Sequence, residues 1–189
     1  LAAAVSAFRL MAQARHIGKL VLTMPGAEVF VLKGELPASA TYLVTGGLGG
    51  IGQELARGLV AWGARNLILL SRQGEQAAGA SQLRAELQAA GARVWIAAVD
   101  VSDRRQLAAL LHTVDAEWPP LRGIIHAAGV LDDGSVLQQS WARMRGVLAP
   151  KVLGAWNLHL LTQQAPLDFY VCFASVAGLQ GALGQSSYA

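Results

Sequence analysis

The stretch TYLVTGGLGGIGQELA, residues 41–56, decides the fold of this 189-residue chain. Residues 41–45 are apolar or β-branched and predict a short buried strand, and an amphipathic run that begins at Gly50 predicts a helix. Between them, Gly47, Gly49 and Gly52 have the G-x-G-x-x-G spacing that lets a backbone approach a pyrophosphate at a helix N-terminus. A purely structural turn is the alternative, and the flanking strand and helix favour a dinucleotide site. The residues expected to contact the cofactor here are Thr45, Gly46, Gly47, Leu48, Gly49, Gly50, Ile51 and Gly52.

Downstream of this stretch, short apolar segments alternate with longer amphipathic ones, which is typical of βαβ units and a parallel sheet. The predicted strands cover residues 41–45, 66–71, 94–99, 123–126 and 168–174. The predicted helices cover residues 50–62, 81–90, 103–117 and 141–164. Ser102 is the expected N-cap of the third helix, and Pro150 is expected to break the fourth. The sequence therefore predicts an α/β fold with a doubly wound parallel sheet, a Rossmann fold, truncated at the C-terminus after its fifth strand.

The composition of the chain and the spacing of its residues argue against several classes of protein. The 15 basic and 12 acidic residues are scattered along the chain, without the clustered basic stripe of a nucleic-acid-binding protein. The only cysteine, Cys172, allows no disulfide within the chain, which favours a reducing, cytoplasmic location. The uncharged stretch 169–189 contains glycine, glutamine and serine, so we interpret it as a strand, a loop and a helix start, and we expect no membrane span. No set of His, Cys and carboxylate residues has metal-ligand spacing, so no metal is expected.

The end of the second predicted strand indicates which dinucleotide is bound. An acidic residue about twenty positions after the glycines would bind the ribose 2′-hydroxyl of NAD. Here the strand ends at Ser71 and Arg72, and a guanidinium binds a phosphate by charge-assisted hydrogen bonds. The pair therefore favours NADPH. The alternative is that Arg72 is a solvated loop residue.

Several ordered motifs resemble the ketoreductase domains of polyketide synthases and fatty-acid synthases, a branch of the short-chain dehydrogenase/reductases. The resemblance covers residues 40–189. It rests on TGGLGGIG at 45–52, LLSR at 69–72, DVSD at 100–103, HAAGVLDD at 126–133, KVLGAWNLH at 151–159, and FASVAG ahead of GQSSYA at the C-terminus.

The resemblance implies a set of catalytic residues. Tyr188 is similar to the general acid that protonates a carbonyl oxygen as hydride arrives, and Lys151 to the cation that lowers the pKa of that phenol. Ser175 resembles the serine that hydrogen-bonds the substrate carbonyl. Taken singly, these residues are also compatible with a core tyrosine, a surface charge and a helix cap.

Further residues follow from the same resemblance. Asp100 and Val101 resemble the pair that holds the adenine, although an Asp before Ser102 is also ordinary turn chemistry. Ala127, Ala128 and Gly129 resemble the loop on the nicotinamide side. His126, which precedes them, is assigned no proton-transfer role, because a lone histidine in a strand is usually a satisfied core residue.

Two patterns indicate the parent enzyme. Leu131-Asp132-Asp133 resembles the marker of ketoreductases that give the B-type alcohol, and Gln185 is compatible with that type. Residues 1–34 resemble the tail of an enoylreductase domain, with a linker at 35–40 before an incomplete NADP-binding domain at 41–189. The implied parent is a multidomain synthase that acts on a β-ketoacyl chain carried by an acyl carrier protein, with its other domains in cis.

The resemblance thus implies NADPH-dependent reduction of a β-ketoacyl thioester to the β-hydroxyacyl product. Because the chain begins at Leu1 and ends just after Tyr188, we expect a fragment without turnover of its own. Two alternatives stay open. One is a non-catalytic structural domain of the same synthase that keeps the cofactor fold, and the other is a free-standing short-chain dehydrogenase, which a Lys at position 192 would favour.

Overall fold

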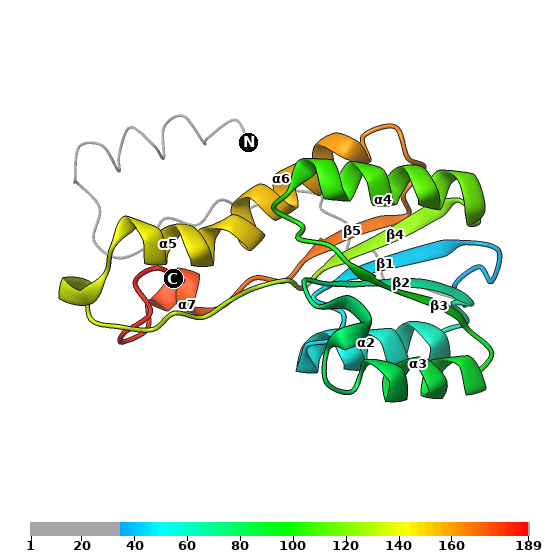
Figure 1. The fold of residues 1–189 in the computed structure, drawn as a ribbon, viewed down its shortest axis with the longest axis horizontal. Coiled ribbons are helices and arrows are strands. Elements are labelled where there is room, and N and C mark those ends of the chain that lie inside the picture. The colour runs from blue at the N-terminus through cyan, green and yellow to red at the C-terminus, as the bar shows by residue number, and fades with distance from the viewer. Residues whose placement is uncertain (1–34, 189) are drawn as a thin grey trace, which may run out of the picture. The chain divides into compact units, whose positions relative to one another are not determined.

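The computed structural model describes residues 35–188. Its centre is a sheet of five parallel strands in the order β3-β2-β1-β4-β5. The strands are β1 (Thr41–Thr45), β2 (Asn66–Ser71), β3 (Arg93–Ala98), β4 (Leu121–His126) and β5 (Phe169–Cys172). Helices cover both faces of the sheet, as Figure 1 shows. The predicted doubly wound α/β fold is confirmed.

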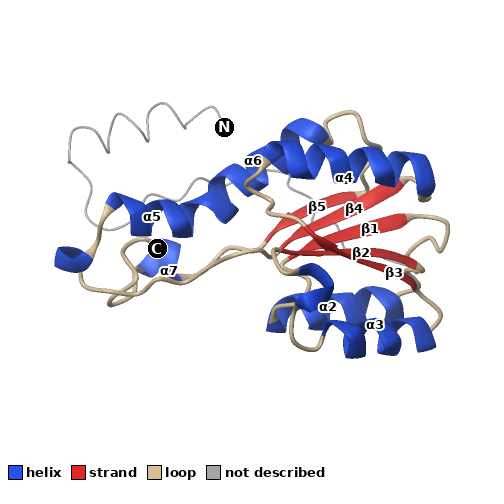
Figure 2. Ribbon diagram, in the orientation of Figure 1, coloured by secondary structure: helices blue, strands red, loops and turns tan. Residues whose placement is uncertain are grey.

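The helices follow the predicted order along the chain, and Figure 2 separates them from the strands by colour. They are α2 (Gly50–Ala61), α3 (Ala80–Ala89), α4 (Arg104–Glu117), α5 (Trp141–Leu148), α6 (Gly154–Leu161) and α7 (Ala177–Gln180). Short 3₁₀ turns lie at Gly74–Gln76 and Val136–Gln138. None of the helices between residues 35 and 188 combines the length and the apolar character that crossing a bilayer requires.

Besides shifts of one or two residues at the ends of several elements, two details differ from the sequence prediction. The N-cap of α4 is Asp103 and not Ser102, because the Asp103 carboxylate accepts from the N–H groups of Arg105 and Gln106 at 2.9 and 3.2 Å. The long helix predicted for 141–164 is two helices joined by a π-helical turn, Ala149–Leu153. Proline lacks an N–H and clashes with the preceding turn, so the break falls at Pro150 as expected.

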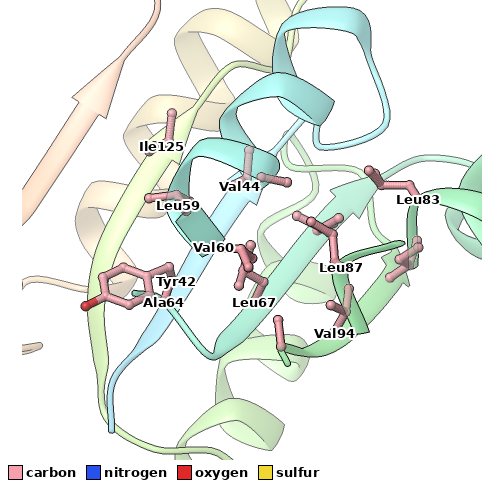
Figure 3. Packing of buried hydrophobic residues seen from close by; sticks show 14 of the residues in the cluster. Tyr42, Val44, Leu59, Val60, Ala64, Leu67, Leu83, Leu87, Val94 and Ile125 are labelled. Atoms are coloured by element: carbon pink, nitrogen blue, oxygen red, sulfur yellow. The ribbon is translucent and has the colours of Figure 1, made fainter. Parts of the chain in front are cut away.

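Side chains alternate across the sheet and build two cores. Tyr42, Val44, Leu67 and Leu69 pack under α2 and α3, and Figure 3 shows this cluster. The intervening residues of the same strands pack under α4 and α6. Because both faces are covered, the strands are continuously apolar, which is the pattern of a buried parallel sheet.

The segment before β1 belongs to the same body as the sheet. Residues 35–40 were predicted as a linker, yet Leu36 is buried in the core under α2, and its N–H donates to the Trp62 carbonyl at 2.6 Å. The enoylreductase-like tail predicted for residues 1–34 lies outside the described residues, and the domain limits stay a prediction.

The topology places a crevice beside β1. The chain leaves β1 toward β2 on one side and returns to β4 on the other, so the loops after β1 and β4 separate at the carboxyl ends of these strands. This is the switch point at which ligands bind in doubly wound sheets. The register sets Thr45 of β1 directly beside His126 of β4.

Candidate active site

At two positions of the glycine loop, the surrounding backbone leaves room only for glycine. Gly46 has φ +67°, and a Cβ there would lie 2.9 Å from the carbonyl group of Ala127. A Cβ at Gly52 would lie 2.1 Å from the Gly46 oxygen. Real Cβ atoms do not approach backbone atoms this closely, so the loop and the first turn of α2 are fixed against each other and against the loop after β4.

The N-terminus of α2 is suited to an anion. The N-cap is Gly49, which has no side chain, and within residues 35–188 no side chain caps the helix and no acidic residue lies in its first turn. The first N–H groups of a helix have no intrahelical partner, and the helix dipole favours negative charge there. The arrangement therefore leaves bare amides where a pyrophosphate would bind.

A cleft opens at the switch point, and most predicted cofactor residues line it. Predicted residues on its wall are Thr45, Gly46, Gly49, Ser71, Arg72, Asp100, Val101, Ala127, Ala128 and Gly129. The sequence reasoning missed four others, which are Leu70, Val99, Val130 and Pro150. Each of these four is the immediate neighbour of a predicted residue, and this adjacency along the chain was the signal that could have found them.

The remaining five predicted loop residues lie elsewhere. Leu48 lines a neighbouring hollow together with Gly49, Ser71 and Arg72. Gly47 is buried and faces Leu69. Gly50 and Ile51 lie on an apolar groove along α2, and Gly52 packs on the glycine loop itself. These positions shape the loop or face away from the cleft.

The polar residues at the adenine end have different environments. Arg72 is exposed and forms no ion pair within the described part of the chain, so its guanidinium is available to a phosphate. The Ser71 hydroxyl oxygen accepts from the Gly74 N–H at 2.9 Å. The Asp100 carboxylate accepts from the N–H and the hydroxyl of Ser102, at 2.9 and 2.7 Å, and so forms the turn that the sequence also allowed.

Lys151 lies at the opposite end of the cleft. Its Nζ donates to the Phe173 carbonyl at 2.9 Å, and its Cε would lie 2.9 Å from a Cβ at Gly129. Burial lowers the pKa of Lys151, and the nearby Cys172 acts in the opposite direction. The ammonium group thus lies between the loop after β4 and the end of β5, beside the nicotinamide side of the predicted cofactor site.

Ser175 and Tyr188 follow β5. The Ser175 hydroxyl oxygen accepts from the Ala177 N–H at 3.1 Å, in the turn before α7. Tyr188 is half-buried, and its N–H donates to the Gln185 carbonyl at 2.9 Å. Among residues 35–188, no hydrogen bond joins the Tyr188 hydroxyl to Ser175 or Lys151.

The loop after β4 holds the segment that carries Tyr188. Gly134 N–H donates to the Gly184 carbonyl at 2.7 Å, and the Gln185 amide donates to the Asp133 carboxylate at 3.1 Å. Arg143 of α5 braces this loop by donating to the Asp132 carboxylate and to the Asp133 carbonyl, at 2.9 and 2.8 Å. The Leu131-Asp132-Asp133 pattern and Gln185, which the sequence linked to one product type, are therefore in mutual contact.

The geometry fits a nicotinamide dinucleotide. Bare amides lie at the helix N-terminus, a free guanidinium lies at one end of the cleft, and an ammonium group lies at the other. Charge, hydrogen-bond donors and apolar walls thus occur in the order that a phosphate-rich, two-ring ligand needs. Within the described residues, no three His, Cys, Asp or Glu side chains gather in a way that could hold a metal ion.

A family model described as the KR domain matches residues 40–189. A phenolphthiocerol synthesis polyketide synthase type I, Pks15/1, from Mycobacterium marinum is 48% identical over 186 residues, which are 98% of this chain and 9% of the relative. Erythronolide synthase EryA2 from Saccharopolyspora erythraea is 44% identical over 190 residues, 100% of this chain and 5% of the relative. The chain therefore spans less than a tenth of each of these synthases.

Solved structures agree with these matches. A-type ketoreductases from a modular polyketide synthase are 41% identical with a TM-score of 0.75, over 90% of this chain and 35% of theirs. The first ketoreductase of the tylosin synthase is 43% identical with a TM-score of 0.74, over 82% of this chain and 34% of its own. KR domains of the short-chain dehydrogenase/reductase superfamily use nicotinamide cofactors. With its glycine loop, its cleft and its sequence matching this group, the chain belongs to the KR-domain family, the ketoreductase domains of polyketide synthases.

Proposed function

We propose that the protein containing this chain reduces a β-ketoacyl thioester, held on an acyl carrier protein, to the β-hydroxyacyl product. One observation carries the proposal. Lys151 lies against Gly129 on the cleft wall and donates to the carbonyl of Phe173, two residues before Ser175. A cation is thus held at the boundary between the cofactor cleft and the segment that supplies a serine and a tyrosine.

Tyr188, Lys151 and Ser175 have different roles in the proposed reaction. Tyr188 donates the proton to the carbonyl oxygen, and the Lys151 ammonium is the cation that stabilises the phenolate left by this step. Ser175 donates a hydrogen bond to the same oxygen and so stabilises the charge that develops on it. NADPH, when bound, supplies the hydride that the β-carbon accepts. Lys151 also holds the cofactor ribose.

NADPH is the proposed cofactor in preference to NADH. The support is Arg72, which lines the cleft beside Ser71 and pairs with no carboxylate among the described residues. A guanidinium can bind a 2′-phosphate by paired hydrogen bonds, whereas NAD-binding sites place a carboxylate at this strand end. Ser71, Asp100 and the glycine loop complete the proposed binding site.

The proposed setting is a cytoplasmic, multidomain synthase. The acyl carrier protein brings the substrate, and further synthase domains act in cis, with an enoylreductase-like segment before residue 35. The product is proposed to be the B-type alcohol, on the support of the Leu131-Asp132-Asp133 pattern and its contact with Gln185. Two matched solved structures are described as A-type, so product configuration is the sharpest part of this proposal to test.

The experiment compares Tyr188→Phe with Tyr170→Phe in the full parent protein. The two variants remove the same hydroxyl, but that of Tyr170 donates to the Ala155 carbonyl at 2.8 Å, outside the cleft lining. With NADPH and a β-ketoacyl thioester, we expect Tyr188→Phe to lower kcat by a factor of roughly 10² to 10⁴, the usual contribution of a general acid. Tyr170→Phe should reduce the thioester at close to the parent rate.

The outcomes separate the alternatives. NADPH binding without reduction by the unmutated protein would favour the non-catalytic structural domain, and one Mycobacterium tuberculosis relative, 47% identical, carries the word inactive in its name. Reduction of small free ketones but not of thioesters would favour a free-standing dehydrogenase. Equal loss of activity in both tyrosine variants would contradict the role given to Tyr188.

A further inference from the structure

His126 occupies a special place at the carboxyl end of β4. It is 1% exposed and lies beside Thr45 in the strand register. Both of its ring nitrogens are hydrogen-bonded, Nδ1 to the Thr45 hydroxyl at 2.7 Å and Nε2 to the Pro150 carbonyl at 2.9 Å. The sequence predicted a satisfied core histidine, and the side chain is satisfied. Its partners, however, belong to the glycine-loop strand and to the turn that carries Lys151.

These partners determine the tautomer of the ring. A carbonyl oxygen can only accept, so Nε2 carries the hydrogen that is donated to Pro150. The Thr45 oxygen already accepts from the Ala128 N–H at 3.2 Å, and its own hydrogen is then free to be donated to Nδ1. A neutral ring with Nε2–H satisfies every group in this chain of bonds. Burial lowers the pKa of His126, which also favours the neutral ring.

The π-helical turn explains why the Pro150 carbonyl is available. In a regular α-helix this carbonyl would accept from the N–H of Gly154, four residues later. Here that N–H donates to the carbonyls of Ala149 and Lys151 instead. Gly154 also gives the ring its space, because a Cβ at this position would lie 3.1 Å from Cε1 of His126 and 2.8 Å from a methyl of Val101. Irregular turns of this kind occur frequently at functional sites.

The turn held by His126 is the one that presents Lys151. Pro150 lines the cofactor cleft, and the next residue places its ammonium group between Gly129 and Phe173. We propose that His126 is a positioning residue that fixes the turn carrying Lys151 relative to the glycine loop through its hydrogen bonds to Thr45 and Pro150. This inference rests on the proposed function, because it assigns Lys151 to the cofactor ribose and the tyrosine.

Two substitutions separate positioning from packing. His126→Asn places a carbonyl oxygen near the Nδ1 position, where it can accept from Thr45, but it has no donor that reaches Pro150. His126→Gln places its amide nitrogen near the Nε2 position and can still donate to Pro150. Both remove a buried ring and should lower the melting temperature. Leu111→Ala, at a buried position of α4 that does not line the cleft, is the control for lost stability alone.

The measurement is NADPH affinity, by titration calorimetry on the full parent protein. We expect His126→Asn to weaken binding about tenfold and His126→Gln to stay within about threefold, while Leu111→Ala leaves the affinity unchanged. Lys151→Met alone should weaken binding by a similar factor. Adding His126→Asn to Lys151→Met should then cost no more than about twofold, because residues that act through one another are not additive.

A second readout is kcat for thioester reduction. If His126→Asn displaces the ammonium of Lys151, kcat should fall, and in His126→Gln it should stay close to that of the parent. Leu111→Ala, which loses packing alone, should leave kcat unchanged at a temperature where the protein is folded.

Several outcomes would overturn the inference. Equal effects of the Asn and Gln variants on affinity, or full additivity with Lys151→Met, would reduce His126 to a packing role. NADPH binding without reduction by the unmutated protein would overturn the proposed function alone, and the affinity cycle would still decide the role of His126. Absence of NADPH binding by the unmutated protein would overturn both.

Discussion

The cofactor side and the catalytic side of the cleft are held in different ways. On the cofactor side, the glycine loop packs so closely on the loop after β4 that a Cβ added at Gly46 would lie 2.9 Å from the Ala127 backbone. On the catalytic side, the segment 184–188 is held by a few polar contacts to residues 133 and 134. Apolar side chains there are exposed, with Leu137 at 97% and Leu183 at 103% of full exposure.

This difference shows where the fold tolerates change. A Cβ at Gly46 or Gly52 would lie less than 3 Å from backbone atoms, so these positions admit only glycine and the cofactor side is geometrically fixed. Polar side-chain contacts between exposed loops can be exchanged one at a time, since each contributes little by itself. We infer that differences in substrate or product among KR domains arise on the catalytic side, and the following predictions test the comparison from the largest expected effect to the smallest.

Gly46→Val should disrupt the cofactor side of the cleft and strongly weaken NADPH binding. The substitution places a β-branched side chain at φ +67° and against the backbone of Ala127, so the loop must move. We expect NADPH affinity to fall by a factor of about 100 or more, measured by calorimetry, because the phosphate-binding amides move with it. Gly58→Ala is the control, since a Cβ there meets nothing within 4 Å. Unchanged NADPH affinity in Gly46→Val would contradict the conclusion that the backbone on the cofactor side is fixed.

Arg72→Ala should weaken the binding of NADPH and leave the binding of NADH unchanged. Loss of a charge-assisted contact to the 2′-phosphate is expected to reduce NADPH affinity roughly 10- to 100-fold, with NADH affinity unchanged. Arg84→Ala is the matched control, because that guanidinium pairs with Glu75 outside the cleft. Equal weakening of NADPH and NADH by Arg72→Ala would show that Arg72 contributes structure and not selectivity.

Arg143→Ala should act on the catalytic side alone. It removes the contacts that brace residues 132–138 and, through Asp133, the segment before Tyr188. A small misplacement of a reacting group is costly, so we expect kcat to fall roughly tenfold while NADPH affinity stays constant. A parallel loss of NADPH affinity would show that the two sides of the cleft are coupled.

Lowering the pH should weaken the ion pair between Arg143 and Asp132 before it affects the sheet. The Arg143 guanidinium holds the pKa of Asp132 below its ordinary value of 3.8. The ion pair therefore stabilises the loop fully above pH 3.8 and loses its effect as pH falls through the lowered pKa. Corrected amide exchange in residues 132–143 should accelerate below about pH 4, while exchange in β1 and β2 stays slow. A simultaneous rise in both regions would mean global unfolding instead.

The sequence predicted the cofactor side closely. Strands β1 and β2 have the predicted bounds, because continuous apolar runs between turn residues allow little else. The glycine spacing located the loop, since the need for glycine arises from the local backbone at Gly46 and Gly52. Asp103 was missed as the cap of α4 because Ser102 has equal capping chemistry, and only the position of the first helical turn distinguishes the two.

The catalytic side depended on contacts between distant residues. Family resemblance named Lys151, Ser175 and Tyr188, but no local pattern shows that Lys151 reaches the carbonyl of Phe173, 22 residues away. The bond from His126 to Pro150 likewise exists only because a π-helical turn redirects one carbonyl. Local steric limits and hydrophobic periodicity let the sequence by itself determine the fold and the glycine loop. The tertiary structure alone decided which side chains meet across the cleft, because hydrogen bonds between loops depend on how separate elements pack.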